Sequence, residues 1–172
     1  MGRRWDDGWR DTSGVDEERE QGGSGEKTYL AAMEPFGEEA ERRILRHRRL
    51  RQGKGFETVE RPREIEKAAA SCRGTVLLET LSVLLANEMF AGETLDESAG
   101  ERILSGVRLL YAEPGISHLV MVSDAIFSGA SKVSPETAAY QKALGSLHRL
   151  LAAEADFLVE VSAGIPIIWK DG

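Results

Sequence analysis

The stretch Gly74–Glu79, GTVLLE, decides the fold class of this chain. Gly74 breaks the preceding segment, and the apolar run behind it predicts a buried strand over Thr75–Glu79. Apolar residues near helical spacing follow at once and predict a helix over Thr80–Phe90. A buried strand that leads directly into a helix is typical of a βαβ unit, whose strands pair in parallel.

The same alternation extends in both directions from this unit. Helices are expected at Gly37–Arg51, Arg63–Ala70, Glu97–Tyr111 and from Pro135 onward, with Ser134 as N-cap. Strands are expected at Thr28–Met33, His118–Ser123, Phe157–Ser162 and Ile165–Trp169, the last two paired with each other. The pattern predicts an α/β fold with a mostly parallel sheet flanked by helices. Ligands bind beyond the carboxyl ends of such strands, so a site is expected just after Met33, Glu79 and Ser123.

Composition limits the class of protein. The 172 residues are about one domain's worth, and the net charge of −7 argues against a nucleic-acid binder, which is usually basic. The single cysteine, Cys72, cannot form an internal disulfide, which excludes a stapled secreted fold. No apolar run approaches the roughly 18 residues of a membrane span, and the charged N-terminus lacks the apolar segment of a secretory signal. We therefore expect a soluble cytoplasmic protein.

Residues 1–27 differ from the rest of the chain. They carry eight acidic and five basic side chains and only four apolar residues. Because so few apolar groups cannot offset the entropy of ordering, we expect a disordered charged tail at 1–27 and a folded domain at 28–172. A wrong start codon or a frameshift upstream of Lys27 is an alternative explanation for this segment.

The segment Arg42–Arg51, RRILRHRRLR, holds six arginines and a histidine within an acidic protein. On a helix, Arg43, His47 and Arg51 follow one another at four-residue spacing and share a face. A histidine between two guanidinium groups suits a phosphate site, since arginine binds phosphate oxygens in pairs. The alternative is a solvated basic helix whose arginines pair with nearby acids. An RNA- or anion-binding module is disfavoured by the net charge and by the lack of interleaved aromatic residues.

Other polar residues have two interpretations each. Glu79, at a strand end, is placed to hold Mg²⁺ on a nucleotide, or it marks the point where the strand turns polar. The pair Asn87-Glu88 either lines a pocket for a substrate or caps the end of its helix. His118 and His148 are expected to be structural, because no His/Cys cluster has the spacing of a metal site.

An ordered set of motifs runs through residues 28–170. It comprises YLAAM at 29–33, RILRHRRLR at 43–51, FETVE at 56–60, VLLE at 76–79, LLANEMF at 84–90, AD at 155–156, GIP at 164–166 and Lys170. This set resembles the bifunctional adenosylcobinamide kinase / adenosylcobinamide-phosphate guanylyltransferase family of cobalamin biosynthesis. The resemblance implies a P-loop NTPase-like sheet, GTP, ATP and Mg²⁺ as the nucleotides and ion, cobinamide and cobinamide phosphate as substrates, and a homo-trimer.

The resemblance also implies a role for each matching residue. The family phosphorylates cobinamide and then transfers GMP from GTP through a guanylylated histidine, which His47 matches. Nucleotide contacts are carried over to Met33, Glu34, Pro35, Arg48, Arg51, Glu60 and Glu79. Glu60 matches the guanosine-contacting carboxylate, and the two arginines would stabilise charge on the transferred phosphate.

The chain departs from the family pattern at its start. The family has a phosphate loop, Gly-Gly-x-x-Ser-Gly-Lys-Ser, after an apolar first strand, whereas residues 21–28 read QGGSGEKT with no apolar strand before them. The first strand and the phosphate loop are therefore predicted to be missing or degenerate, with a gap in the sheet and doubt over the kinase step. Further departures are Ala32, Ser123-Asp124 and His148. A catalytically dead or truncated nucleotide-binding remnant is the alternative function.

Overall fold

The computed structural model describes residues 25–34, 37–124 and 133–172. The strands are β1 (Lys27–Ala31), β2 (Phe56–Glu60), β3 (Gly74–Glu79), β4 (Ile116–Val122), β5 (Phe157–Ser162) and β6 (Ile165–Asp171). The helices are α1 (Gly37–Arg51), η2 (Ile65–Ser71, a 3₁₀ helix), α2 (Leu81–Met89), α3 (Ala99–Ala112) and α4 (Pro135–Glu154). Most of the segment expected to be a tail, together with Pro35, lies outside the described residues.

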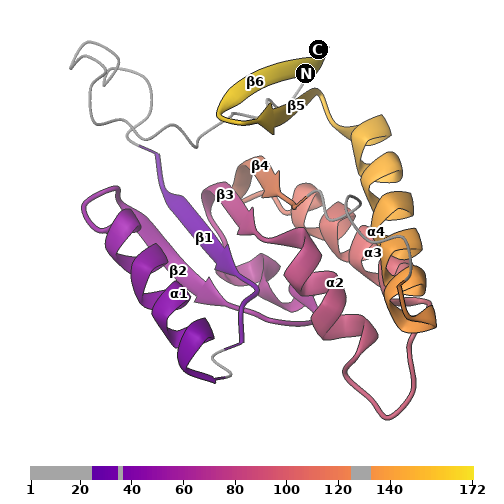
Figure 1. The fold of residues 1–172 in the computed structure, drawn as a ribbon. Coiled ribbons are helices and arrows are strands. Elements are labelled where there is room, and N and C mark those ends of the chain that lie inside the picture. The colour runs from indigo at the N-terminus through magenta and orange to yellow at the C-terminus, as the bar shows by residue number, and fades with distance from the viewer. Residues whose placement is uncertain (1–24, 35–36, 125–132) are drawn as a thin grey trace.

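Four strands form one parallel sheet in the order β2-β1-β3-β4, which confirms the predicted fold class. The buried run of β3 lies between β1 and β4, with Leu77 opposite Tyr29 on one side and Val120 on the other. Helix α1 lies along β1 and β2, while α2, α3 and α4 are grouped at the other side of the molecule (Figure 1). The arrangement is consistent with a P-loop NTPase-like fold.

The expected gap in the sheet is wrong for the described strands. Both edges of β3 are paired, to β1 and to β4, so no strand position stands open between them. The hairpin β5–β6 is antiparallel, as its turn at Gly164 requires, and forms a separate sheet set apart from the other four strands (Figure 1). The described strands therefore form one continuous sheet, with β2 and β4 at its edges.

Two expected elements differ in detail. Strand β2 was not predicted, because only Phe56 and Val59 of its five residues are apolar and the strand lies at the sheet edge. The helix predicted at Arg63–Ala70 forms as the 3₁₀ helix η2, a form common in short connecting segments. The other helices lie within two residues of their predicted bounds.

The core lies between the sheet and the helices on its α2–α4 side. Leu30 and Leu78 from the sheet are fully buried, as are Leu84 and Leu85 of α2 and Leu144 of α4. The predicted start of α4 is confirmed, since Ser134 accepts a hydrogen bond from the Thr137 backbone and Pro135 occupies the first turn. No helix in the described ranges is long and apolar enough to cross a membrane.

Candidate active site

A cavity of about 290 Å³ lies at the carboxyl ends of β1 and β3, with α1 as one wall. It is lined by Tyr29, Ala31, Met33, Glu41, Ile44, Leu45, His47, Arg48, Arg51, Thr58, Glu60, Glu79 and Thr80. Two of the three strand ends at which the sequence predicted a site, those of Met33 and Glu79, contribute to it. The third, Ser123, does not line this cavity.

One carboxylate oxygen of Glu79 holds two side chains. His47 Nδ1 lies 3.1 Å from Glu79 Oε2, and the Tyr29 hydroxyl donates a hydrogen bond to the same oxygen. The Glu79 side chain is only 12% exposed and that of His47 23%, so the contact lies in the cavity wall rather than in bulk water. When Nδ1 carries the proton it donates to Glu79, and the other ring nitrogen, Nε2, then carries the lone pair of a nucleophile.

Arg51 stacks on the ring of Tyr29, with its Cζ atom 3.4 Å from the ring centroid. Among the described residues, no acceptor contacts the buried Nη1 of Arg51. Because a buried guanidinium nitrogen without an acceptor is costly, an anion in the cavity would be stabilised there. Burial, followed by the hydrogen bond and charge of Glu79, raises the pKa of Tyr29, so the phenol remains a donor at neutral pH.

The rim of the cavity carries the other predicted nucleotide contacts. Arg48 Nη2 donates to Glu60 Oε1 at 2.5 Å, with both side chains more than half exposed. Met33 lines the cavity beside them. Glu34 does not line it and instead forms an ion pair with Arg63 at 3.1 Å. Pro35 lies outside the described residues.

Arg43 does not share the cavity face with His47 and Arg51. It is exposed and does not line the cavity, whereas Ile44 does. The reason is helix geometry. Residues four positions apart are rotated by about 40° around the helix axis, and residues eight apart by about 80°, so Arg43 turns away from the face that carries Arg51. Arg42 on the outer face pairs with Glu38 at 3.1 Å, so that face is solvated and only the inner face of α1 reaches the site.

Lys27 and Thr28 lie at the opposite end of the sheet from the cavity. Both belong to β1, where Lys27 is in register with Phe56 and Thr75. Ala31, the cavity residue at the far end of the same strand, is about 13 Å away at the rise of an extended strand. Lys27 therefore cannot act as a phosphate-loop lysine toward this cavity.

The site offers little to a metal ion on its own. Within the described residues, no group of three or more His, Cys, Asp or Glu side chains could hold one. The two contacts to Glu79 both use Oε2, and the second carboxylate oxygen, Oε1, is of the type that binds Mg²⁺. His118 is exposed, and His148 Nε2 contacts the Ser123 hydroxyl at 2.7 Å, which fits a structural role.

Sequence reasoning did not assign Tyr29 to the site. It was quoted as part of a strand, yet its hydroxyl contacts a carboxylate 50 positions away and its ring supports Arg51. A buried tyrosine needs a partner for its hydroxyl, and the polar end of the neighbouring strand, Glu79, was the available signal. Thr80 and Glu41 also line the cavity without having been predicted.

The family model described as cobinamide kinase / cobinamide phosphate guanyltransferase matches residues 13–168. The chain belongs to this family. Its members act in cobalamin biosynthesis as nucleotide-dependent transferases. The cavity therefore belongs to a protein of a nucleotide-using enzyme family. The match starts inside the segment expected to be a tail. None of the curated proteins compared with the chain matches it.

Proposed function

We propose that this protein transfers GMP from GTP to cobinamide phosphate, with His47 as the nucleophile of the catalytic cavity. The observation that carries the proposal is the contact of His47 Nδ1 with Glu79 Oε2, beside the buried Nη1 of Arg51. A histidine held by a carboxylate can attack a phosphate, and a guanidinium can stabilise the charge that develops. Family membership supports the same substrates.

The transfer takes two displacements at one phosphorus. In the first, the Nε2 lone pair of His47 bonds to the α-phosphorus of GTP, the bond to the bridging oxygen breaks, and pyrophosphate leaves with its electron pair. The Nδ1 proton stays on the ring, stabilised by Glu79. In the second, a phosphate oxygen of cobinamide phosphate attacks the same phosphorus, and the nitrogen–phosphorus bond breaks to restore His47.

The remaining predicted residues take supporting roles in this proposal. Arg51 would bind the transferred phosphate, and Arg48, Met33 and Glu60 would contact the nucleotide at the rim. Glu79 Oε1 would be the protein ligand of a Mg²⁺ ion brought by GTP. The folded domain that binds the nucleotide would be residues 28–172.

The kinase step is not part of the proposal. The position of Lys27 in strand β1, far from the cavity, supports this exclusion, since phosphoryl transfer in phosphate-loop enzymes depends on a lysine at the phosphates. Measurement of phosphate transfer from ATP or GTP to cobinamide is expected to give no product. Product formed by the wild-type chain would contradict the exclusion.

Labelling with GTP tests the transferase directly. Incubation with α-labelled GTP and Mg²⁺ is expected to give an acid-labile, base-stable adduct, with release of pyrophosphate. His47→Ala should remove the label completely. His118→Ala, which alters an exposed histidine of β4, is the matched control and should label like the wild type. A label that persists in His47→Ala would overturn the proposed nucleophile.

The alternative function, a catalytically dead remnant, predicts a different result in labelling and in calorimetry. Calorimetry would then show GTP binding to the wild-type chain, while the labelling assay would give neither adduct nor pyrophosphate.

We also propose a homo-trimer, as the family resemblance implies. The exposed apolar side chains of the β5–β6 hairpin, among them Ile165, Ile168 and Trp169, support an interface there. Light scattering that gives the mass of one chain would contradict the trimer.

A further inference from the structure

Tyr29 lines the cavity that holds His47, although the proposed transfer of GMP gives it no part. It lies in β1, in register with Thr58 of β2 on one side and Leu77 of β3 on the other. Because strands are paired to both edges of β1, ladder hydrogen bonds hold the backbone at this position in both directions. The residue is only 5% exposed, so its ring is packed as closely as its backbone.

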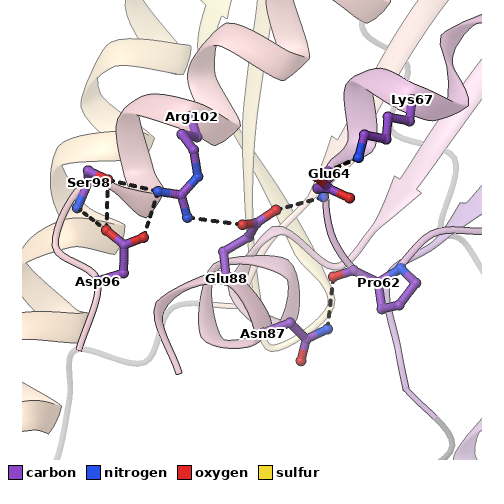
Figure 2. A network of polar contacts seen from close by, with 8 residues as sticks. All are labelled: Pro62, Glu64, Lys67, Asn87, Glu88, Asp96, Ser98 and Arg102. Atoms are coloured by element: carbon purple, nitrogen blue, oxygen red, sulfur yellow. Dashed lines mark hydrogen bonds and ion pairs between the residues drawn. The ribbon is translucent and has the colours of Figure 1, made fainter. Parts of the chain in front are cut away.

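The carboxyl end of β1 is also fixed by α2. The Asn87 amide donates to the backbone oxygens of Ala32 at 2.8 Å and of Pro62 at 3.1 Å, and Figure 2 shows the second of these bonds. The buried carboxylate of Glu88 accepts from the backbone N–H just ahead of η2 at 2.7 Å (Figure 2). Neither side chain caps α2, and both instead hold the backbone that follows β1 and β2. Tyr29 therefore lies on a strand that is fixed at both edges and at its end.

The side chain of Tyr29 stands on the face of the sheet that carries the cavity. Side chains on this face form rows across the strands, with Thr58, Tyr29 and Leu77 in one row and Glu60, Ala31 and Glu79 in the next. The Tyr29 hydroxyl reaches diagonally from the first row into the second, where it donates to Glu79 Oε2. Ala31 is the middle residue of the second row, and its methyl side chain leaves space for a ring to reach across.

The hydroxyl fixes the carboxylate beside His47. A glutamate side chain has three rotatable bonds, so its carboxylate takes one direction only where contacts hold it. Glu79 Oε2 accepts from Tyr29 and lies 3.1 Å from His47 Nδ1. One carboxylate oxygen can accept both bonds at once, because it has two lone pairs. Without the tyrosine hydroxyl, Glu79 would keep its charge but lose the contact that directs it toward His47.

The face of the ring holds Arg51. The guanidinium carbon Cζ lies 3.4 Å from the ring centroid, which is a stacking distance. The ring is packed edge to face against Phe56, with 6.5 Å between the centroids and 82° between the planes. An arginine side chain is long and flexible, so a flat and buried surface against it decides where its donors lie. Tyr29 therefore also sets the place of this guanidinium in the cavity wall.

We propose that Tyr29 positions two parts of the GMP transfer, His47 through its hydroxyl and Arg51 through its ring. The inference rests on the proposed function, because it takes His47 as the nucleophile and Arg51 as the phosphate-binding group. The role requires no contact between Tyr29 and GTP. The orientation of a nucleophile affects the rate of attack, whereas the place of a guanidinium affects how tightly the phosphates are held before attack. The two contacts of this residue therefore give two separable effects.

Two substitutions in the full chain separate the hydroxyl from the ring. Tyr29→Phe keeps the ring, so the rate of labelling at saturating GTP should fall about tenfold while the affinity for GTP in calorimetry stays unchanged. Tyr29→Met also removes the flat ring, but leaves an adaptable side chain that fills irregular space. Its labelling rate should fall as in Tyr29→Phe, and its affinity for GTP should fall about tenfold as well.

Tyr140→Phe is the matched control. The Tyr140 hydroxyl is half-buried and donates to the Ser82 backbone oxygen at 2.8 Å, and the residue does not line the cavity. This variant loses a hydrogen-bonded hydroxyl away from Glu79, so it should label and bind GTP like the wild type. If Tyr29 had only a structural role, Tyr29→Phe would likewise lower the urea midpoint without changing the labelling rate.

Three results would overturn the role of Tyr29. They are a wild-type labelling rate in Tyr29→Phe, the same affinity for GTP in Tyr29→Phe and Tyr29→Met, and an equal loss of rate in Tyr140→Phe. If Tyr29→Met does not fold, the separation of rate from affinity in Tyr29→Phe decides alone. The proposed function fails on a different result, which is a wild-type chain that takes no label or a label that persists in His47→Ala. In that case Tyr29 has no nucleophile to position, and its role fails too.

Discussion

At the level of single residues, the proposed transfer of GMP depends on one oxygen of Glu79. It orients the imidazole of His47 and accepts from the Tyr29 hydroxyl, so a loss of its charge affects both. Glu79→Gln is expected to lower the rate of GTP labelling by about 10²-fold, the scale on which oriented proton acceptors act. The rate of adduct formation measures this effect.

Glu57→Gln is the control for the loss of a carboxylate. Glu57 is an exposed residue of β2 outside the cavity, and its removal should leave labelling unchanged. If Glu79→Gln labelled at the wild-type rate, the carboxylate would have no part in activating the histidine.

Arg51 carries a second prediction at this scale. Lysine keeps the charge but loses both the flat stacking surface on Tyr29 and the buried Nη1 donor. Arg51→Lys is therefore expected to weaken GTP binding about tenfold in calorimetry. Arg49→Lys, on the exposed outer face of the same helix, should bind normally. Equal affinity in the two variants would remove Arg51 from the nucleotide site.

The residue scale also shows how far the sequence predicts the cavity. His47 and Arg51 were predicted from the spacing of charged residues along one helix, and Glu79 from its place at a strand end. All three line the same cavity. The place of Tyr29 in the site was not predicted, because it depends on a contact between distant segments. The position of Arg43 off the cavity face was not predicted either, because it depends on the exact rotation of the helix.

At the level of elements, local signals decided which predictions succeeded. Helix α4 has a Ser134 N-cap and Pro135 in its first turn, and the helix begins as predicted. Strand β2 has neither alternation nor a continuous apolar run, so its pairing with β1 had no local signal. The pairing of β3 with β4 likewise depends on which strands are available, a property of the whole sheet.

The N-cap of α4 gives a prediction at the same scale. Ser134→Ala removes the acceptor for the Thr137 backbone N–H and should lower the free energy of unfolding by about 1 kcal/mol. Urea denaturation measures the change. Ser105→Ala, at an exposed position inside α3, is the control and should change stability by less than about 0.5 kcal/mol. Equal losses in both variants would mean that the cap contributes nothing particular.

At the level of the whole molecule, the described chain consists of a four-stranded parallel sheet with its helices and a hairpin set apart from it (Figure 1). An isolated two-stranded hairpin is marginally stable in water. Here β6 is exposed along its whole length, and one of its few ties is the hydrogen bond from Lys170 to the Ala153 backbone of α4. The first part of the molecule to open in hydrogen exchange is therefore expected to be β5–β6, before any strand of the parallel sheet.

His148 links the stability of the whole fold to pH. It lies half-buried on α4, and its Nε2 contacts the hydroxyl of Ser123, the residue after β4, at 2.7 Å. Burial lowers the pKa of His148 below the usual imidazole value of 6.5. The unfolded chain therefore binds a proton more readily than the folded chain, and stability falls as pH drops through and below that value. The carboxyl groups whose pKa values are lowered, such as Asp96 and Glu154, titrate at lower pH and therefore change the stability only in a more acidic range.

The wild-type urea midpoint should accordingly fall between pH 7.5 and pH 5. His148→Gln keeps a polar side chain near Ser123 but cannot take up a proton, so its midpoint should fall less over the same range. His118→Gln serves as the control at an exposed position and should retain the wild-type dependence. If His148→Gln and the wild type lost stability in parallel, the pH dependence would arise elsewhere, and the contact between His148 and Ser123 would be insensitive to protonation.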